Sequence, residues 1–98
     1  MAALFVVELT VKNPEKLKEY SAQTPAILQK YKGQLLMKGK TLQVHASNAP
    51  AAAYDTVVVF EFPSKEDALA WYHSPEYGEG KAIRHAASRS RMVVVEGL

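Results

Sequence analysis

The sequence contains no cysteine among its 98 residues. This absence excludes disulfide bonds, thiolate nucleophiles and thiolate metal ligands, and it fits a reducing compartment, so we expect a cytoplasmic location. A long apolar run is also missing. The N-terminal run from Ala2 to Val7 is interrupted by Glu8, far short of the ~20 residues that a membrane-spanning helix needs. We therefore expect a strand there, and no association with a membrane.

The sequence also lacks an excess of charge of one sign. Twelve Lys and Arg residues are balanced by ten Asp and Glu residues, giving a formal net charge of +2. Electrostatic capture of a polyanion needs a stronger imbalance, so we expect no nucleic-acid partner. The composition, with 48% hydrophobic and 22% charged residues, is that of a soluble globular protein. The length suits one domain, residues 1–98.

The first third of the chain is predicted to form a strand and a helix. Residues 3–11 are rich in Val, Leu and Phe without a breaker, which is typical of a strand. Asn13 followed by Pro14 is a typical helix start, because Asn caps free amides and proline suits the first helical position. We expect Pro25 to kink this helix and Gly33 to end it.

The middle of the chain is predicted to form two strands joined by a loop. Residues 34 to about 45 alternate in part and are interrupted at Gly39, which indicates a strand with a bulge or bend there. The segment from about Ser47 to Tyr54 has few large apolar side chains, so we expect a solvated, mobile loop. Residues 56–62 then form the third predicted strand.

The last third is predicted to form two helices and a strand. Ser64, with an acid three residues later, resembles a capping box at the start of a helix. The Ser74-Pro75 pair ends this helix and starts another, which runs to about Ala87. Residues 92–96 form the final strand.

The predicted order β-α-β-β-α-β indicates an α+β, ferredoxin-like sandwich, with a four-stranded antiparallel sheet and the helices on one face. Alternate residues of the strands are apolar on both sides, and two helices can cover only one face. We therefore expect the second face to pack on another copy of the chain as a homodimer. We assign six residues to that face: Leu4, Val6, Val57, Val59, Met92 and Val94.

The order of several short motifs resembles a known family. These motifs are Pro14, Tyr20, Pro25, Tyr31-Lys32-Gly33, Glu61-Phe62-Pro63-Ser64, Trp71-Tyr72, Ser74-Pro75-Glu76-Tyr77, Arg84 and Val94-Val95-Glu96-Gly97. The chain resembles the domain-of-unknown-function family DUF1330, within the dimeric α/β-barrel superfamily. This resemblance implies two subunits whose sheets form a barrel-like dimer, with small-molecule pockets between sheet and helices in superfamily relatives. It implies no established activity.

The chain departs from the family pattern around its second and third strands. His45-Ala46 stands where such proteins typically show Glu-Gly, and Asp55-Thr56 stands where an arginine opens the third strand. The three histidines lack metal-ligand spacing, and Gly78-Glu79-Gly80-Lys81-Ala82 lacks the residues of a phosphate-binding loop. We therefore expect neither a metal nor a cofactor.

The candidate site is a pocket between the helices and the sheet. Its predicted residues are Tyr20, Trp71, Tyr77 and Arg84, with His45 or Glu61 as further contributors. Aromatic walls, a phenol donor and a fixed cation suit a planar or carboxylate-bearing metabolite. Arg84 has an alternative role as a structural anchor that bonds a carboxylate or strand carbonyls, and Glu61 has one as a solvated residue at a strand end.

Three functions are compatible with the sequence. The first is a homodimeric protein that binds a small molecule of unknown identity. The second is a cofactor-free enzyme of the monooxygenase or isomerase kind, as seen in superfamily relatives. The third is a non-catalytic protein-interaction module.

Overall fold

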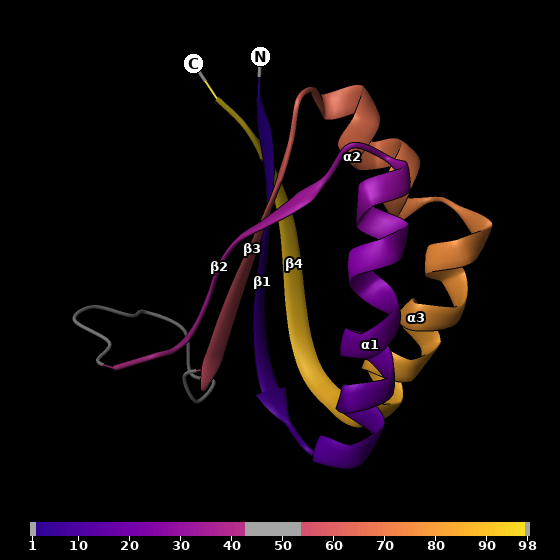
Figure 1. The fold of residues 1–98 in the computed structure, drawn as a ribbon. Coiled ribbons are helices and arrows are strands. Elements are labelled where there is room, and N and C mark those ends of the chain that lie inside the picture. The colour runs from indigo at the N-terminus through magenta and orange to yellow at the C-terminus, as the bar shows by residue number, and fades with distance from the viewer. Residues whose placement is uncertain (1, 43–53, 98) are drawn as a thin grey trace.

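The computed structural model describes residues 2–42 and 54–97, which form a sheet layer and a helix layer (Figure 1). The elements are β1 (Ala3–Val11), α1 (Pro14–Lys30), β2 (Gln34–Lys40), β3 (Thr56–Phe62), α2 (Lys65–Tyr72), α3 (Pro75–Ala87) and β4 (Ser88–Glu96). The sheet is antiparallel in the order β2-β3-β1-β4, and all three helices lie on one side of it. This confirms the predicted ferredoxin-like α+β fold.

The predicted helix starts are confirmed by their capping bonds. The Asn13 side chain accepts a hydrogen bond from the Lys16 amide at 3.2 Å, at the start of α1. Ser64 accepts from the Asp67 amide at 3.2 Å, and Ser74 accepts from the Tyr77 amide at 3.1 Å. Each cap supplies a partner for an amide that the helix itself leaves free. The sequence between residues 64 and 87 therefore forms two separate helices, with Ser74 capping the second.

The end of α1 is held by two backbone bonds and a close contact. Helix α1 continues through Pro25 to Lys30. Lys32, with φ of 67°, donates its amide to Gln29 O, and Gly33 donates to Leu28 O. This pair of bonds is the Schellman pattern, with lysine in the left-handed position that glycine usually takes.

Gly33 itself is required for space and not for a left-handed conformation. A Cβ at Gly33 would lie 2.5 Å from Cε1 of Phe62 and 3.0 Å from Cδ2 of Leu28. Phe62 is fully buried, so its ring has little room to move aside. The chain can pass this close to the core only where a side chain is missing.

Strand β2 is the edge strand and the least buried element. All its residues are exposed, and its pairing with β3 shifts register between Leu35 and Met37. A bulge is therefore present in this strand, as predicted. Its predicted position at Gly39 was wrong, because Gly39 pairs regularly with Val57.

The core lies between the sheet and the helices, with Trp71 of α2 at its centre. The Trp71 ring centroid lies 5.3 Å from Phe5, 5.5 Å from Phe60 and 4.1 Å from Tyr77. These rings come from β1, β3 and α3, so one side chain joins both layers. The buried strand residues alternate along β1 and β3: Ala3, Phe5, Val7, Leu9, Val58, Phe60 and Phe62.

The opposite face of the sheet is left uncovered by the helices, and we call it the open face. The strand register places four of the six predicted residues on this face: Leu4, Val6, Val57 and Val59. Val6 pairs with Val59 of β3 on one side and with Val93 of β4 on the other, and Met37 of β2 pairs with Val59. An apolar row thus crosses all four strands of the described sheet.

The assignment of Met92 and Val94 to the open face was wrong. Val94 pairs with Phe5 and Met92 pairs with Val7, so both lie on the helix-covered face. All four residues from 92 to 95 are apolar, so alternation alone could not tell which pair faces the helices. On the open face, β4 instead presents Val93 and Val95.

Two further sequence expectations concern the loop and the membrane. The predicted mobile loop lies outside the described residues, apart from Tyr54. The guanidinium of Arg89 lies 4.4 Å from the centroid of the Tyr54 ring, a cation–π contact with β4. Among residues 2–42 and 54–97, none of the helices has the length and apolarity needed to cross a bilayer.

The contact between Gly33 and Phe62 predicts opposite effects for two glycine substitutions. We expect Gly33→Ala to lower the free energy of unfolding by about 1–3 kcal/mol, because the new methyl group overpacks the core. A methyl group at Gly78 in α3 would meet no neighbouring element within 4 Å, so Gly78→Ala is expected to raise stability by about 0.5–1 kcal/mol. Urea unfolding followed by circular dichroism measures both, and destabilisation of equal size in the two variants would contradict this account.

Candidate functional site

A cavity of about 410 Å³ lies between α1 and the sheet. This volume is within the range of small-molecule pockets, roughly 300–1,000 Å³. Its floor consists of residues from the helix-covered face of β1 and β3, namely Val7, Leu9, Thr56, Val58 and Phe60. Its wall is the inner face of α1, with Leu17, Tyr20, Ser21, Thr24, Pro25 and Leu28.

The outer side of the cavity is formed by exposed residues. Gln29, Gln34, Leu35 and Lys38 line it and are all exposed, so the cavity meets solvent between α1 and β2. Lys38 is the only ionised side chain among the described residues that line the cavity. A largely apolar space with one cation at its edge suits an apolar molecule with a polar or anionic end.

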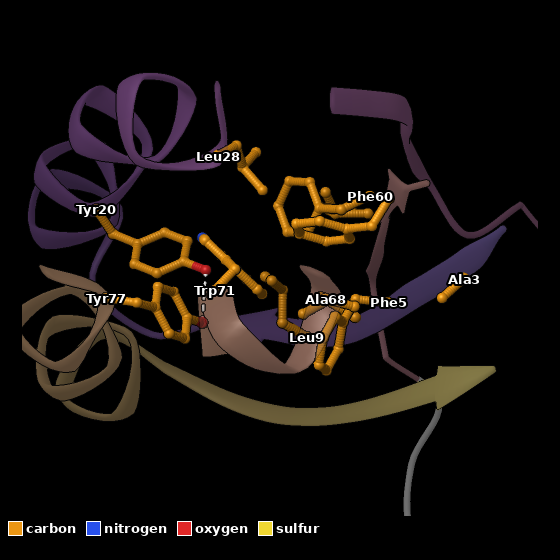
Figure 2. Close-up of a cluster of buried hydrophobic side chains, with 12 residues drawn as sticks. Ala3, Phe5, Leu9, Tyr20, Leu28, Phe60, Ala68, Trp71 and Tyr77 are labelled. Carbon is orange, nitrogen blue, oxygen red and sulfur yellow. Dashed lines mark hydrogen bonds between the residues drawn. The ribbon is translucent and has the colours of Figure 1, made fainter. Parts of the chain in front are cut away.

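Next to this cavity, a hydrogen-bonded cluster joins α1, α3 and β4. The hydroxyl groups of Tyr20 and Tyr77 lie 2.9 Å apart, and Figure 2 shows the two side chains pointing toward one another. Arg84 Nη1 donates to the Tyr77 hydroxyl at 2.8 Å and also contacts Met92 Sδ. Arg84 and Tyr77 therefore share one face of α3, as their spacing of two helical turns predicts.

Arg84 is a buried cation without an acidic partner in residues 2–42 and 54–97. Its side chain is 3% exposed, and none of the carboxylates described there forms an ion pair with it. Its Nη2 lies 3.3 Å from His85 Nε2, and its Nε has no hydrogen-bond partner in the described part of the chain. A buried charge of this kind is costly unless surrounding dipoles stabilise it. The two phenols supply such dipoles.

Burial keeps both phenols protonated. It raises the pKa of Tyr77, and the neighbouring Tyr20 phenol adds to that rise. Burial also raises the pKa of Tyr20, although the hydrogen bond to Tyr77 and the charge of Arg84 act in the opposite direction. Both hydroxyl groups are therefore neutral hydrogen-bond donors near neutral pH, and they are poor bases.

Two other predicted site residues, Trp71 and Glu61, lie outside this hydrogen-bonded cluster. Trp71 is fully buried in the core, and its Nε1 has no hydrogen-bond partner among the described residues. Glu61 lies on the open face, where its carboxylate accepts a hydrogen bond from Gln34 Nε2 at 2.8 Å. His45 lies outside the described residues. The structure thus brings Tyr20, Tyr77 and Arg84 together by hydrogen bonds and places the Trp71 ring against Tyr77. Of these four residues, only Tyr20 lines the cavity.

Sequence reasoning missed the residues that line the cavity beside Tyr20. Thr24 and Leu28 follow Tyr20 at helical spacing, and this periodicity was visible in the sequence as a core face. Lys38 gave no such signal, because the bulge in β2 hides which residues share a face with Val58. No group of three or more His, Asp or Glu residues able to hold a metal occurs within the described ranges.

The cluster predicts that Tyr77 contributes more to stability than an exposed tyrosine does. We expect Tyr77→Phe to lower the free energy of unfolding by about 1–3 kcal/mol, because Arg84 Nη1 and the Tyr20 hydroxyl each lose a buried partner. The matched control is Tyr31→Phe, which removes a hydrogen bond of 3.2 Å to Glu76 nearer the surface. That change should cost less than about 1 kcal/mol.

Urea unfolding at one fixed protein concentration compares the two variants, since association with a second copy would otherwise shift the midpoint. Equal losses of unfolding free energy for Tyr77→Phe and Tyr31→Phe would show that the buried cluster contributes no more to stability than a hydrogen bond near the surface.

The comparisons with known proteins agree on the fold. The structure is similar to that of a protein of unknown function from Rhodopseudomonas palustris, with a TM-score of 0.77, 18% identity, and coverage of 99% of this chain and 82% of that chain. It is also similar to a dimeric ferredoxin-like protein of unknown function from Jannaschia sp., with a TM-score of 0.72, 14% identity, and coverage of 99% and 100%.

A third similar structure is SnoaB from Streptomyces nogalater, a cofactor-independent oxygenase. Its TM-score is 0.70 at 14% identity, with 99% of this chain and 93% of that chain covered. At such identities the likeness shows a shared fold and no shared activity.

The sequence comparisons give a family but no function. No curated protein matches the chain. The model of one family, described as a domain of unknown function, DUF1330, matches residues 2–98. This match covers almost the whole chain, as the motifs from Pro14 to Gly97 predict. The chain therefore belongs to the DUF1330 family.

Proposed function

We propose that the protein is a homodimer that binds a small, mainly apolar molecule between α1 and the sheet. The observation that carries this proposal is the cavity of about 410 Å³, with a mainly apolar floor and a wall that includes Tyr20. An apolar ligand would gain free energy by burying its surface there, and the few polar groups would orient it. The absence of cysteine supports a cytoplasmic location.

Binding without chemistry is supported by the groups that line the cavity. Its described lining includes no His, Asp or Glu, and the pKa of Tyr20 is raised by burial. A general base works best with a pKa near the operating pH, and burial moves the pKa of Tyr20 away from it.

A cofactor-free oxygenase is the second candidate, and the similarity to SnoaB favours it. Such an enzyme would consume O₂ when its ligand is added, whereas a binding protein would not. An oxygen electrode therefore separates the two proposals for any compound that binds.

The homodimer is supported by the open face. Met37, Val59, Val6 and Val93 form an apolar row across the sheet, and helices cover only the other face. Polar side chains border this row: Glu61 bonds Gln34 on one side, and Glu8 lies 4.0 Å from Arg91 on the other. An apolar centre with a polar rim is typical of a protein interface, and a two-fold axis would bring two such rows together. The similar protein from Jannaschia is described as dimeric.

Filling the cavity should abolish binding. We expect Val58→Phe to reduce the affinity for 2-ethylnaphthalene at least tenfold, because the larger ring would occupy the floor of the cavity. Val94→Phe is the matched control, since Val94 lies on the same face of the sheet but does not line the cavity. Displacement of a fluorescent dye or calorimetry measures both affinities. Equal binding by wild type and Val58→Phe would contradict the proposed site.

A charge in the middle of the apolar row should prevent dimer formation. We expect Val59→Asp to give a monomer or aggregates, because a buried unpaired carboxylate costs several kcal/mol at the interface. Ala70→Asp adds the same charge at an exposed position of α2 and should leave the dimer intact. Light scattering on a sizing column at micromolar concentration reports the mass, and a monomeric wild type would refute the homodimer.

A further inference from the structure

The buried cation sets the direction of the hydrogen bonds around it. An arginine side chain has only donors, so the Tyr77 oxygen must accept the bond of 2.8 Å from Arg84 Nη1. The single proton of the Tyr77 hydroxyl is then free to be donated elsewhere. Two acceptors lie within reach: the Tyr20 oxygen at 2.9 Å and Met92 Sδ at 3.6 Å.

The Tyr20 oxygen is the stronger acceptor of the two. A thioether sulfur is a weak acceptor, and Met92 Sδ already receives a contact from Arg84 Nη1. The charge-assisted bond from Arg84 also polarises the Tyr77 hydroxyl and strengthens it as a donor. Arg84 therefore donates to Tyr77, and Tyr77 donates to Tyr20.

This series of hydrogen bonds ends at the proton of the Tyr20 hydroxyl. In the bond of 2.9 Å between the two hydroxyl groups, the direction set by Arg84 makes the Tyr20 oxygen the acceptor, so the proton of Tyr20 remains for another partner. Of the three residues joined by these bonds, Tyr20 is the one that lines the cavity. We propose that the Tyr20 hydroxyl donates a hydrogen bond to a carbonyl or oxyanion oxygen of the ligand, and that Arg84 fixes this direction through Tyr77.

This inference rests on the proposed binding site and adds the chemical class of the ligand. The raised pKa of Tyr20 keeps its proton in place, so the phenol acts as a donor and not as a base. The charge of Arg84 reaches the Tyr20 hydroxyl and has no acid to neutralise it among the described residues. Both properties favour a ligand oxygen that is partly or fully negative, as in a ketone, an enolate or a phenolate.

Two probes with the same carbon skeleton test the donor directly. The ketone 2-acetylnaphthalene and the hydrocarbon 2-ethylnaphthalene are each titrated into the wild-type protein and into Tyr20→Phe. We expect the affinity ratio of ketone to hydrocarbon to fall about threefold to tenfold in Tyr20→Phe, the weight of one buried hydrogen bond. The infrared carbonyl stretch of the bound ketone should lie at a lower wavenumber in the wild type than in the variant.

The control separates a specific donor from a general effect of losing a hydroxyl. Tyr31→Phe also removes a phenol hydroxyl, but Tyr31 does not line the cavity, so the ratio and the carbonyl stretch should match those of the wild type. An unchanged ratio and an unchanged stretch in Tyr20→Phe would overturn the donor role while leaving the cavity as a binding site. Failure of both probes to bind the wild type would overturn the proposed site and this inference together.

A second variant tests the link to Arg84. Tyr77→Phe leaves the Tyr20 hydroxyl in place but removes the group that polarises it, so the shift of the carbonyl stretch should be smaller than in the wild type. A shift of full size in a folded Tyr77→Phe protein would show that Arg84 does not act through Tyr77.

Discussion

A buried guanidinium without a described acidic partner is the constraint around which this structure is organised. Arg84 lies three residues before the end of α3, and β4 begins at the next residue, Ser88, without an intervening loop. The Ser88 hydroxyl donates to the Arg84 carbonyl at 2.8 Å, while the guanidinium contacts Met92 of the following strand. The charge is stabilised by the dipoles of Tyr77 and Tyr20, which come from two different helices. The stabilisation of this one charge therefore depends on the packing of α1 against α3.

The cavity lies between α1 and the sheet, beside this cluster. Strand β2 is exposed along its whole length, and Figure 1 shows the helices on one side of the sheet with β2 at its edge. Gly33 brings the chain close to Phe62 at one end of this space, and Tyr20 borders its wall. A rigid, polar cluster thus lies beside an apolar space, an arrangement that suits recognition of a molecule with one polar oxygen.

Local chemistry made most of the fold predictable from the sequence. The caps at Asn13, Ser64 and Ser74 act over three residues, and all three are present in the structure. The alternation in β1 and β3 likewise places aromatic residues on one face of the sheet, as it does in the structure. The face of β4 was not predictable, because its apolar run has no polar residue to mark the solvent side. Its register is set by pairing with β1.

The candidate site was predictable only in part. The spacing of Tyr77 and Arg84 on one helix showed that they share a face, whereas their contact with Tyr20 depends on how α1 packs against α3. Glu61 was a reasonable candidate by chemistry, but the sheet separates it from the cavity. The cavity itself arises from distances between elements, which no single stretch of sequence encodes.

The most direct test is a crystal structure of the complex with 2-acetylnaphthalene. The account predicts the naphthalene ring in the cavity over Val58, with the ketone oxygen about 2.7 Å from the Tyr20 hydroxyl oxygen. It also predicts that the bond between Tyr77 and Tyr20 persists in the complex. A ketone oxygen directed toward Lys38 or solvent, with no contact to Tyr20, would contradict it.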